Sequence, residues 1–186
     1  MSKYQPLLGS GWQPLPEFLE KKKAIINIRN DDERCFGYSL LYFLDRPCNS
    51  KHLERPIYYN DEMFSRNSLD SLPYPISPND VHLFEDKLLV NINVFTFFDD
   101  KGLARHPLVI SRKNYSRVAN LIYWNGHYAP IVIISRLFSD ITKHKQLKHI
   151  CLRCLGHFTT SNILARHQQL CTRDDFMSVL HVLPVP

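Results

Sequence analysis

Hydrophobic residues follow helical spacing in the first part of the chain. Phe36, Leu40, Phe43 and Leu44 share one helix face, and residues 30–32 form a polar capping turn before them. We therefore expect a helix over 33–44. Residues 46–72 are polar, with little periodicity, and predict a long loop. Pro78 follows Ser77 at the start of a second predicted helix, over 77–87.

The later pattern is that of strands. Apolar and polar residues alternate over 89–97, and a second short strand is expected over 106–110, after a turn at 99–102. Residues 118–124 and 127–134 predict two strands joined by Asn125-Gly126, a strong signal for a type I′ hairpin. Residues 24–28 predict one more strand, and 135–142 a short helix. This order of elements predicts an α+β domain with a largely antiparallel sheet.

Composition adds the domain plan and the charge. The chain has 186 residues, of which 44% are hydrophobic and 12% aromatic, as expected for a packed globule. We divide it into an irregular arm (1–23), the α+β domain (24–142), a basic linker (143–150), a zinc finger (151–171) and a tail (172–186). The net charge is +5. Part of this excess lies in the linker residues Lys143, Lys145 and Lys148, which could follow a phosphate backbone.

No segment indicates export or membrane insertion. The first twelve residues lack an apolar core, and the longest apolar run, over 128–134, is far too short to span a bilayer. Reduced cysteines beside a zinc motif are typical of the nucleus or cytoplasm. We expect a nuclear or cytoplasmic protein that is not secreted and has no membrane partner.

The zinc motif is the most specific pattern in the chain. Cys151, Cys154, His167 and Cys171 have the spacing C-x2-C-x12-H-x3-C and include three of the five cysteines. Phe158 and Leu164 stand where a ββα finger has its small core. Thiolates and imidazole are the ligands that tetrahedral zinc prefers, and binding supplies about 10–16 kcal/mol to a unit that is too small to fold alone. We expect a C2H2-type finger with cysteine as its last ligand.

The predicted finger is poorly suited to reading a DNA sequence. Its base-facing positions would be Thr160, Ile163 and Arg166, of which only Arg166 is a good base reader. One finger covers about three base pairs, which is too few for useful specificity. We expect weak, non-specific nucleic-acid binding through Lys143, Lys145, Lys148 and Arg166, or binding to a protein.

A cysteine and a histidine form a second candidate site. Cys35 opens the first predicted helix, where the helix dipole favours a thiolate, and His127 opens a strand directly after a tight turn. This arrangement resembles papain-like cysteine peptidases, and the order of elements is most similar to OTU-type deubiquitinases. That resemblance implies a small papain/OTU-like domain with Cys35 as nucleophile and His127 as base. The glycine expected before the nucleophile is missing, and Ala129 replaces the residue that would orient the histidine.

A further resemblance covers more of the chain. The resemblance rests on a series of short motifs in a fixed order: Gly9-Ser10, the run 22–27, Cys35-Phe36, His127-Tyr128 and the zinc motif. They are similar to the region that precedes the family B DNA polymerase of Polinton-like transposons. The resemblance implies an accessory module linked to DNA replication, while no polymerase activity can be carried over.

Two hypotheses follow from these patterns. The first is a zinc-dependent interaction module of transposon or viral origin that binds nucleic acid non-specifically or a replication partner. The alternative is an OTU-like cysteine peptidase that acts on ubiquitin-like proteins through Cys35 and His127, and we expect that site to be inactive. The peptidase hypothesis requires the Cys35 thiol to lie close to the His127 imidazole, and the interaction-module hypothesis does not.

Overall fold

The protein is described by a computed structural model covering residues 11–47, 51–97, 105–138, 149–152 and 156–171. The chain divides into two compact units, Met1–Ile133 and Ile134–Pro186. Several expectations fall outside the described residues: the turn at 99–102, the linker lysines, Cys154 and the tail. Within the described residues, no helix is long and apolar enough to cross a bilayer.

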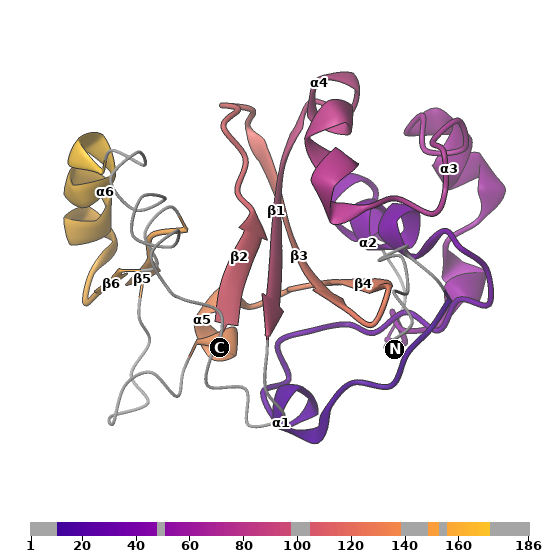
Figure 1. Cartoon of the computed structure of the whole chain (residues 1–186), viewed down its shortest axis with the longest axis horizontal. Helices are drawn as coiled ribbons and strands as arrows, with labels where there is room; N and C mark the ends of the chain where they lie inside the picture. Colours follow the sequence, from indigo (N-terminus) through magenta and orange to yellow (C-terminus); the bar gives the residue numbers. More distant parts are fainter. Residues whose placement is uncertain (1–10, 48–50, 98–104, 139–148, 153–155, 172–186) are drawn as a thin grey trace, which may run out of the picture. The chain divides into compact units, whose positions relative to one another are not determined.

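The first unit is built on a four-stranded sheet in the order β2-β1-β3-β4 (Figure 1). The strands are β1 (Val90–Phe97), β2 (Arg105–Val109), β3 (Arg117–Trp124) and β4 (His127–Pro130). β1 pairs antiparallel with β2 but parallel with β3, and β3 pairs antiparallel with β4. The sheet is therefore mostly antiparallel, and the α+β fold class is confirmed at this level.

The β3–β4 turn has the backbone that the sequence predicts. Asn125 and Gly126 both have positive φ, 46° and 79°, as a type I′ turn requires. β4 is shorter than the predicted strand and ends at Pro130. Residues 24–28 form only an isolated bridge, between Ile25 and Ile131, instead of the expected strand. The segment still closes the sheet edge, because Ala24 O accepts from Val132 N at 2.8 Å.

The helical segments of the first unit are α1 (Glu17–Glu20), α2 (Cys35–Leu44), the 3-10 helix η1 (Pro56–Tyr58), α3 (Asp61–Arg66), the 3-10 helix η2 (Pro78–Phe84) and α4 (Glu85–Leu88). α2 and α4 pack on one face of the sheet, and α3 packs against α2 (Figure 1). The expectation of a long loop over 46–72 is wrong, because it contains η1 and α3. Asn60 caps α3 by accepting from Met63 N, and Met63 and Phe64 supply its buried face.

The core lies between α2 and the sheet. Phe36, Leu40 and Leu41 of α2 are fully buried, as are Ile92 and Leu121 of the sheet. This buried apolar area is the main stabilising contribution to the first unit.

Buried amides on β1 hold the connection between β2 and β3. Asn91 Nδ2 donates to the carbonyl oxygens of Tyr115 and Arg117 at 2.7 and 2.9 Å, and Asn91 Oδ1 accepts from Tyr115 N at 3.1 Å. Asn93 Oδ1 accepts from Ser111 N at 2.9 Å. These bonds satisfy backbone groups that strand pairing leaves unpaired, and they explain why two polar residues are tolerated inside β1.

The second unit is small. Its described elements are α5 (Ile134–Leu137), β5 (His149–Ile150), β6 (His157–Phe158) and α6 (Ser161–Leu170). β5 and β6 form a two-stranded antiparallel sheet, and none of the residues of α6 is buried. An isolated two-stranded hairpin is marginal in water, and so is a helix of this length. The unit therefore needs a further source of stability.

Candidate functional site

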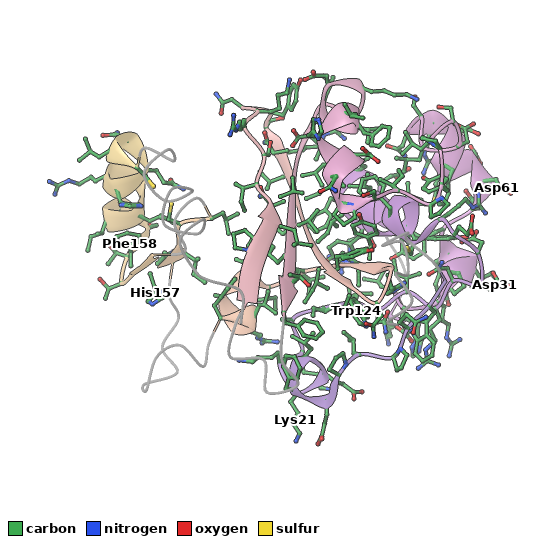
Figure 2. The ribbon with its side chains drawn as sticks, viewed as in Figure 1. Lys21, Asp31, Asp61, Trp124, His157 and Phe158 are labelled. Carbon is green, nitrogen blue, oxygen red and sulfur yellow. The ribbon has the colours of Figure 1, made fainter. Side chains whose placement is uncertain are left out.

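The hairpin and helix of the second unit bring three zinc-motif residues together. Cys151 directly follows β5, and its backbone N–H donates to Gly156 O at 2.9 Å across the hairpin. His167 lies in the last turn of α6, and Cys171 is the C-cap residue of that helix. Phe158 of β6, labelled in Figure 2, packs its ring at 4.5 Å from that of His167. The ligand positions are thus set by the hairpin and by the end of α6.

The distances within this group suit a metal ion. The ligand atoms of Cys151, His167 and Cys171 lie within 4.8 Å of one another, and the two sulfur atoms are 3.8 Å apart. Two thiolates at about 2.3 Å from a tetrahedral zinc ion are separated by about 3.8 Å, whereas a disulfide requires about 2.05 Å. The group could therefore hold a metal ion, which agrees with the predicted cofactor at this coarser level.

The remaining zinc-motif expectations differ in outcome. Cys154, the predicted fourth ligand, lies outside the described residues and stays a prediction. In the hairpin His149 pairs with Phe158 and His157 pairs with Ile150, and neither histidine belongs to the group that could hold a metal ion.

The outer face of α6 combines apolar and basic side chains. Thr160 is the N-cap, and its hydroxyl oxygen accepts from Ile163 N. Ile163 is 46% exposed, and Arg166 is exposed as well. Arg166 is the one charged donor to a base or a phosphate among these three positions. Lys143, Lys145 and Lys148 lie outside the described residues.

Cys35 opens α2, as the sequence predicts, but it points into the core. Its side chain is 1% exposed. Burial, with a smaller contribution from Asp32, raises the pKa of the Cys35 thiol to about 11, although the backbone N–H groups of Tyr128 and Phe36 act to lower it. Burial thus outweighs the helix dipole, and the thiol is protonated at neutral pH.

His127 is buried and has a specific partner. Its Nε2 lies 3.0 Å from Asn27 Oδ1, and its ring packs edge-on against Trp124, which is labelled in Figure 2. Asn27 Nδ2 donates to Gln13 O at 2.8 Å, which fixes the amide with its oxygen toward the ring. Nε2 therefore carries the proton in neutral His127, and Nδ1 is the acceptor atom.

Asn27 is the orienting residue that the sequence does not reveal. The OTU-type resemblance places the residue that orients the histidine at position 129, and the side chain of Ala129 cannot accept a hydrogen bond. Asn27 lies a hundred positions upstream of His127, and only the pairing of its segment with the sheet edge brings the two together. The pattern around Asn27 contains no signal for this role.

Cys35 lies on α2, which packs against β4, and His127 is the first residue of that strand. The Cys35 thiol lies beside the Tyr128 backbone, and the ring of Tyr128 packs on Phe36 at 5.2 Å. Successive side chains of a strand point to opposite faces, so the ring of His127 lies on the other face, with Trp124. Direct contact between thiol and imidazole stays a prediction.

A pocket of about 310 Å³ opens beside Asn27. Its wall includes Trp12, Arg29 and Glu54, and the Arg29 guanidinium lies 6.0 Å from the Trp12 ring centroid. Neither Cys35 nor His127 lines this pocket. The Cys35 thiol is therefore not part of the wall of this pocket.

Comparison of the chain with protein-family models, with curated proteins and with solved structures found no match.

Proposed function

We propose that the second unit is a ββα zinc finger in which Cys151, Cys154, His167 and Cys171 bind one zinc ion. The observation that carries this proposal is the 3.8 Å separation of the Cys151 and Cys171 sulfur atoms, with the His167 ring beside them. Three thiolates and a neutral imidazole match the ligand preference of zinc, and the absence of buried residues on α6 indicates a need for metal-derived stability.

Elemental analysis of the full chain tests this site. We expect about one zinc per chain, and its loss in the Cys154→Ser variant. The matched control is His157→Ala, because His157 is an exposed strand residue outside the ligand group. Stoichiometric zinc in Cys154→Ser, or its loss in His157→Ala, would contradict the ligand set.

The proposed role of this finger is interaction. The module would bind nucleic acid weakly and without sequence preference, or a replication partner, as the Polinton-like resemblance implies. Supporting this, α6 presents one cation, Arg166, next to the exposed Ile163, which cannot donate a hydrogen bond to a base. A phosphate contact through the linker carries no base information.

A pair of triple variants tests nucleic-acid binding. Replacing Lys143, Lys145 and Lys148 by glutamine should weaken binding about equally for all DNA sequences and lower the salt slope, because each phosphate contact contributes about 0.9 to that slope. The same replacement at Lys21, Lys22 and Lys23 removes an equal charge from the other unit and should have little effect. An equal loss of DNA affinity in both variants would show that only the total charge matters and not the position of the linker lysines. A preference of the protein for one short DNA sequence would contradict the proposal.

A second candidate function is that of an OTU-like cysteine peptidase, and the hydrogen bond between Asn27 and His127 favours it. An amide that fixes the tautomer of a histidine is the support that a general base needs. The buried, protonated thiol of Cys35 disfavours it at rest. We propose that the site is inactive, and that a reactive ubiquitin probe labels the chain slowly or not at all. Rapid labelling that both Cys35→Ala and His127→Ala abolish would establish the peptidase instead.

A further inference from the structure

A second pocket in the first unit is lined by basic side chains from three separate segments. It has a volume of about 180 Å³. Its polar wall consists of Arg66, Asn67, Ser68, Lys87 and Arg117, and the rest of the lining is leucine. The lining contains three cations and no carboxylate.

The fold explains why these side chains meet. α3 ends at Arg66, and α4 ends just before Leu89, whose left-handed backbone (φ 50°) turns the chain into β1. β1 and β3 start side by side, with Val90 opposite Arg117 in the parallel register. The pocket is thus lined by residues where α3 and α4 end and the two central strands begin.

The basic groups retain donors that the protein does not use. Arg66 gives its Nε to Asp45, which also accepts from Asn67 Nδ2 at 3.1 Å, and Lys87 Nζ donates to Ser71 Oγ at 2.6 Å. Arg117 is exposed, and its guanidinium has no carboxylate partner among the described residues. Arg66 has two carboxylate partners, because its Nε donates to Asp45 and its Nη1 lies 4.0 Å from Glu62 Oε1. Lys87 and Arg117 therefore supply the net positive charge of the pocket.

A structural role accounts for only part of this arrangement. Arg66 and Lys87 lie in the last turns of short helices, where cations offset the carbonyl ends. Arg117 begins a strand and has no such role. A guanidinium, an ammonium, a hydroxyl and an amide around one concave surface are the donors that recognise a phosphate group.

We propose that this pocket binds a phosphate group through Lys87, Arg117 and Ser68, with Arg66 supporting it. The same chemistry fits free inorganic phosphate and the phosphodiester of a nucleic-acid backbone. The proposal goes beyond the zinc-dependent function, because the site belongs to the other unit and uses none of the zinc ligands. A backbone phosphate bound here would give the first unit its own nucleic-acid contact.

The test is an NMR titration of the full, zinc-loaded chain at constant ionic strength. Inorganic phosphate should shift the amide signals of Ser68, Lys87 and Arg117 with saturation, whereas added chloride should not. In the variant with Lys87→Gln and Arg117→Gln the apparent affinity should fall about tenfold or more. The control, Lys51→Gln with Arg55→Gln, removes the same charge from exposed positions outside the pocket and should keep the affinity.

A short DNA duplex distinguishes the two phosphate sources. Competition between duplex and phosphate for the same signals, with a salt slope lower by about two in the pocket variant, would assign the site to a nucleic-acid backbone. Binding of inorganic phosphate without competition would assign it to a free anion. No saturable shift with either probe, or the same shift in the pocket variant, would overturn the proposal. The Cys154→Ser variant should keep phosphate binding, so failure at the zinc site and failure here can be told apart.

Discussion

Two buried polar groups in the first unit show how a single atom can decide the properties of a site. The thiol of Cys35 and the hydroxyl of Tyr123 both lie in the core, where water cannot reach them. The Tyr123 hydroxyl has no hydrogen-bond partner among the described residues. Burial raises the pKa of Tyr123 to about 12, with a smaller contribution from Cys35. Both groups are therefore held in their neutral forms.

Replacing Tyr123 by phenylalanine should stabilise the chain. The change removes a buried hydroxyl without a partner and keeps the ring that packs on Tyr128 at 4.7 Å. Leaving such a group unsatisfied costs about 1–3 kcal/mol, so the free energy of unfolding in urea should rise by about 1 kcal/mol. The control is Tyr128→Phe, which loses a bond from its hydroxyl to Ile76 O at 3.1 Å and should destabilise. A less stable Tyr123→Phe variant would show that the hydroxyl has a partner.

Stability should fall at alkaline pH through Cys35. The thiol pKa is about 11 in the folded chain against an ordinary value of 9.0, so below pH 9 both states keep the proton. Between about pH 9 and 11 the unfolded chain loses it first, and the free energy of unfolding should drop by an amount on the order of 2 kcal/mol.

Urea unfolding at pH 7, 9 and 10.5 measures this dependence. The comparison with Cys35→Ala isolates the contribution of the thiol, because the tyrosines titrate in both proteins. We expect a smaller loss of stability with pH in the variant, even though its stability at pH 7 is reduced by the cavity. Parallel curves for the two proteins would mean that Cys35 does not couple folding to pH.

For individual residues, the sequence predicts contacts between residues that are close in the chain. It does not predict contacts between residues that only the folded sheet brings together. Cys151, His167 and Cys171 come together because a hairpin and a helix have fixed spacing, and that spacing is visible in the sequence. Cys35 is correctly placed at the start of a helix, but its burial depends on the packing of α2 against β4. Asn27 reaches His127 only through the closing of the sheet edge, for which a single sequence has no signal.

At the level of elements, α2 depends on a glycine at its closest approach to the neighbouring segments. A methyl group at Gly37 would overlap the ring of Phe64 and the hydroxyl of Tyr74. The strong apolar pattern of 36–44 predicts the helix but not this contact. α3 is not predicted from the sequence, because a helix of six residues is too short to show a clear apolar period within a polar segment. Its local signals are the Asn60 cap, the acidic residues Asp61 and Glu62 in the first turn and Arg66 in the last turn.

Gly37→Ala should therefore destabilise the first unit, although alanine is normally the better helix former by about 1 kcal/mol. Overpacking of this kind costs about 1–3 kcal/mol, and the thermal midpoint should fall accordingly. Gly11→Ala is the matched control, since its new methyl group would lie 3.5 Å from the nearest atom, in ordinary contact. An unchanged or higher midpoint for Gly37→Ala would show that Phe64 and Tyr74 can move aside at little cost.

Across the whole molecule, the two units obtain stability from different sources. The first has a continuous apolar core that includes Leu40, Ile92 and Leu121. The second has short strands and a helix without buried residues, arranged around a group of potential metal ligands. From the sequence, the α+β domain is expected to end at residue 142, whereas the second compact unit begins at Ile134.

Removing metal should unfold the second unit and leave the first intact. In hydrogen exchange with a strong chelator, amides of α6 should lose protection, because binding energy of about 10–16 kcal/mol is folding energy in such modules. Amides of β1 and β3 should exchange as before. The Cys154→Ser variant should match the chelated protein without any chelator. Protection of α6 that survives chelation would mean that the second unit folds without a metal ion.

The bridge between Ile25 and Ile131 has a consequence for the order in which the chain can fold during synthesis. The carbonyl of Ala24 and the backbone of Ile26 bond to residues 132 and 130, so an early segment of the first unit pairs with its last residues. The parallel β1–β3 pairing adds another long-range closure. A ribosome adds about 5–20 residues per second, so residues 24–26 must wait several seconds for their partners. Until residues 127–133 have left the exit tunnel, His127 cannot meet Asn27, and the nascent first unit is open along that edge.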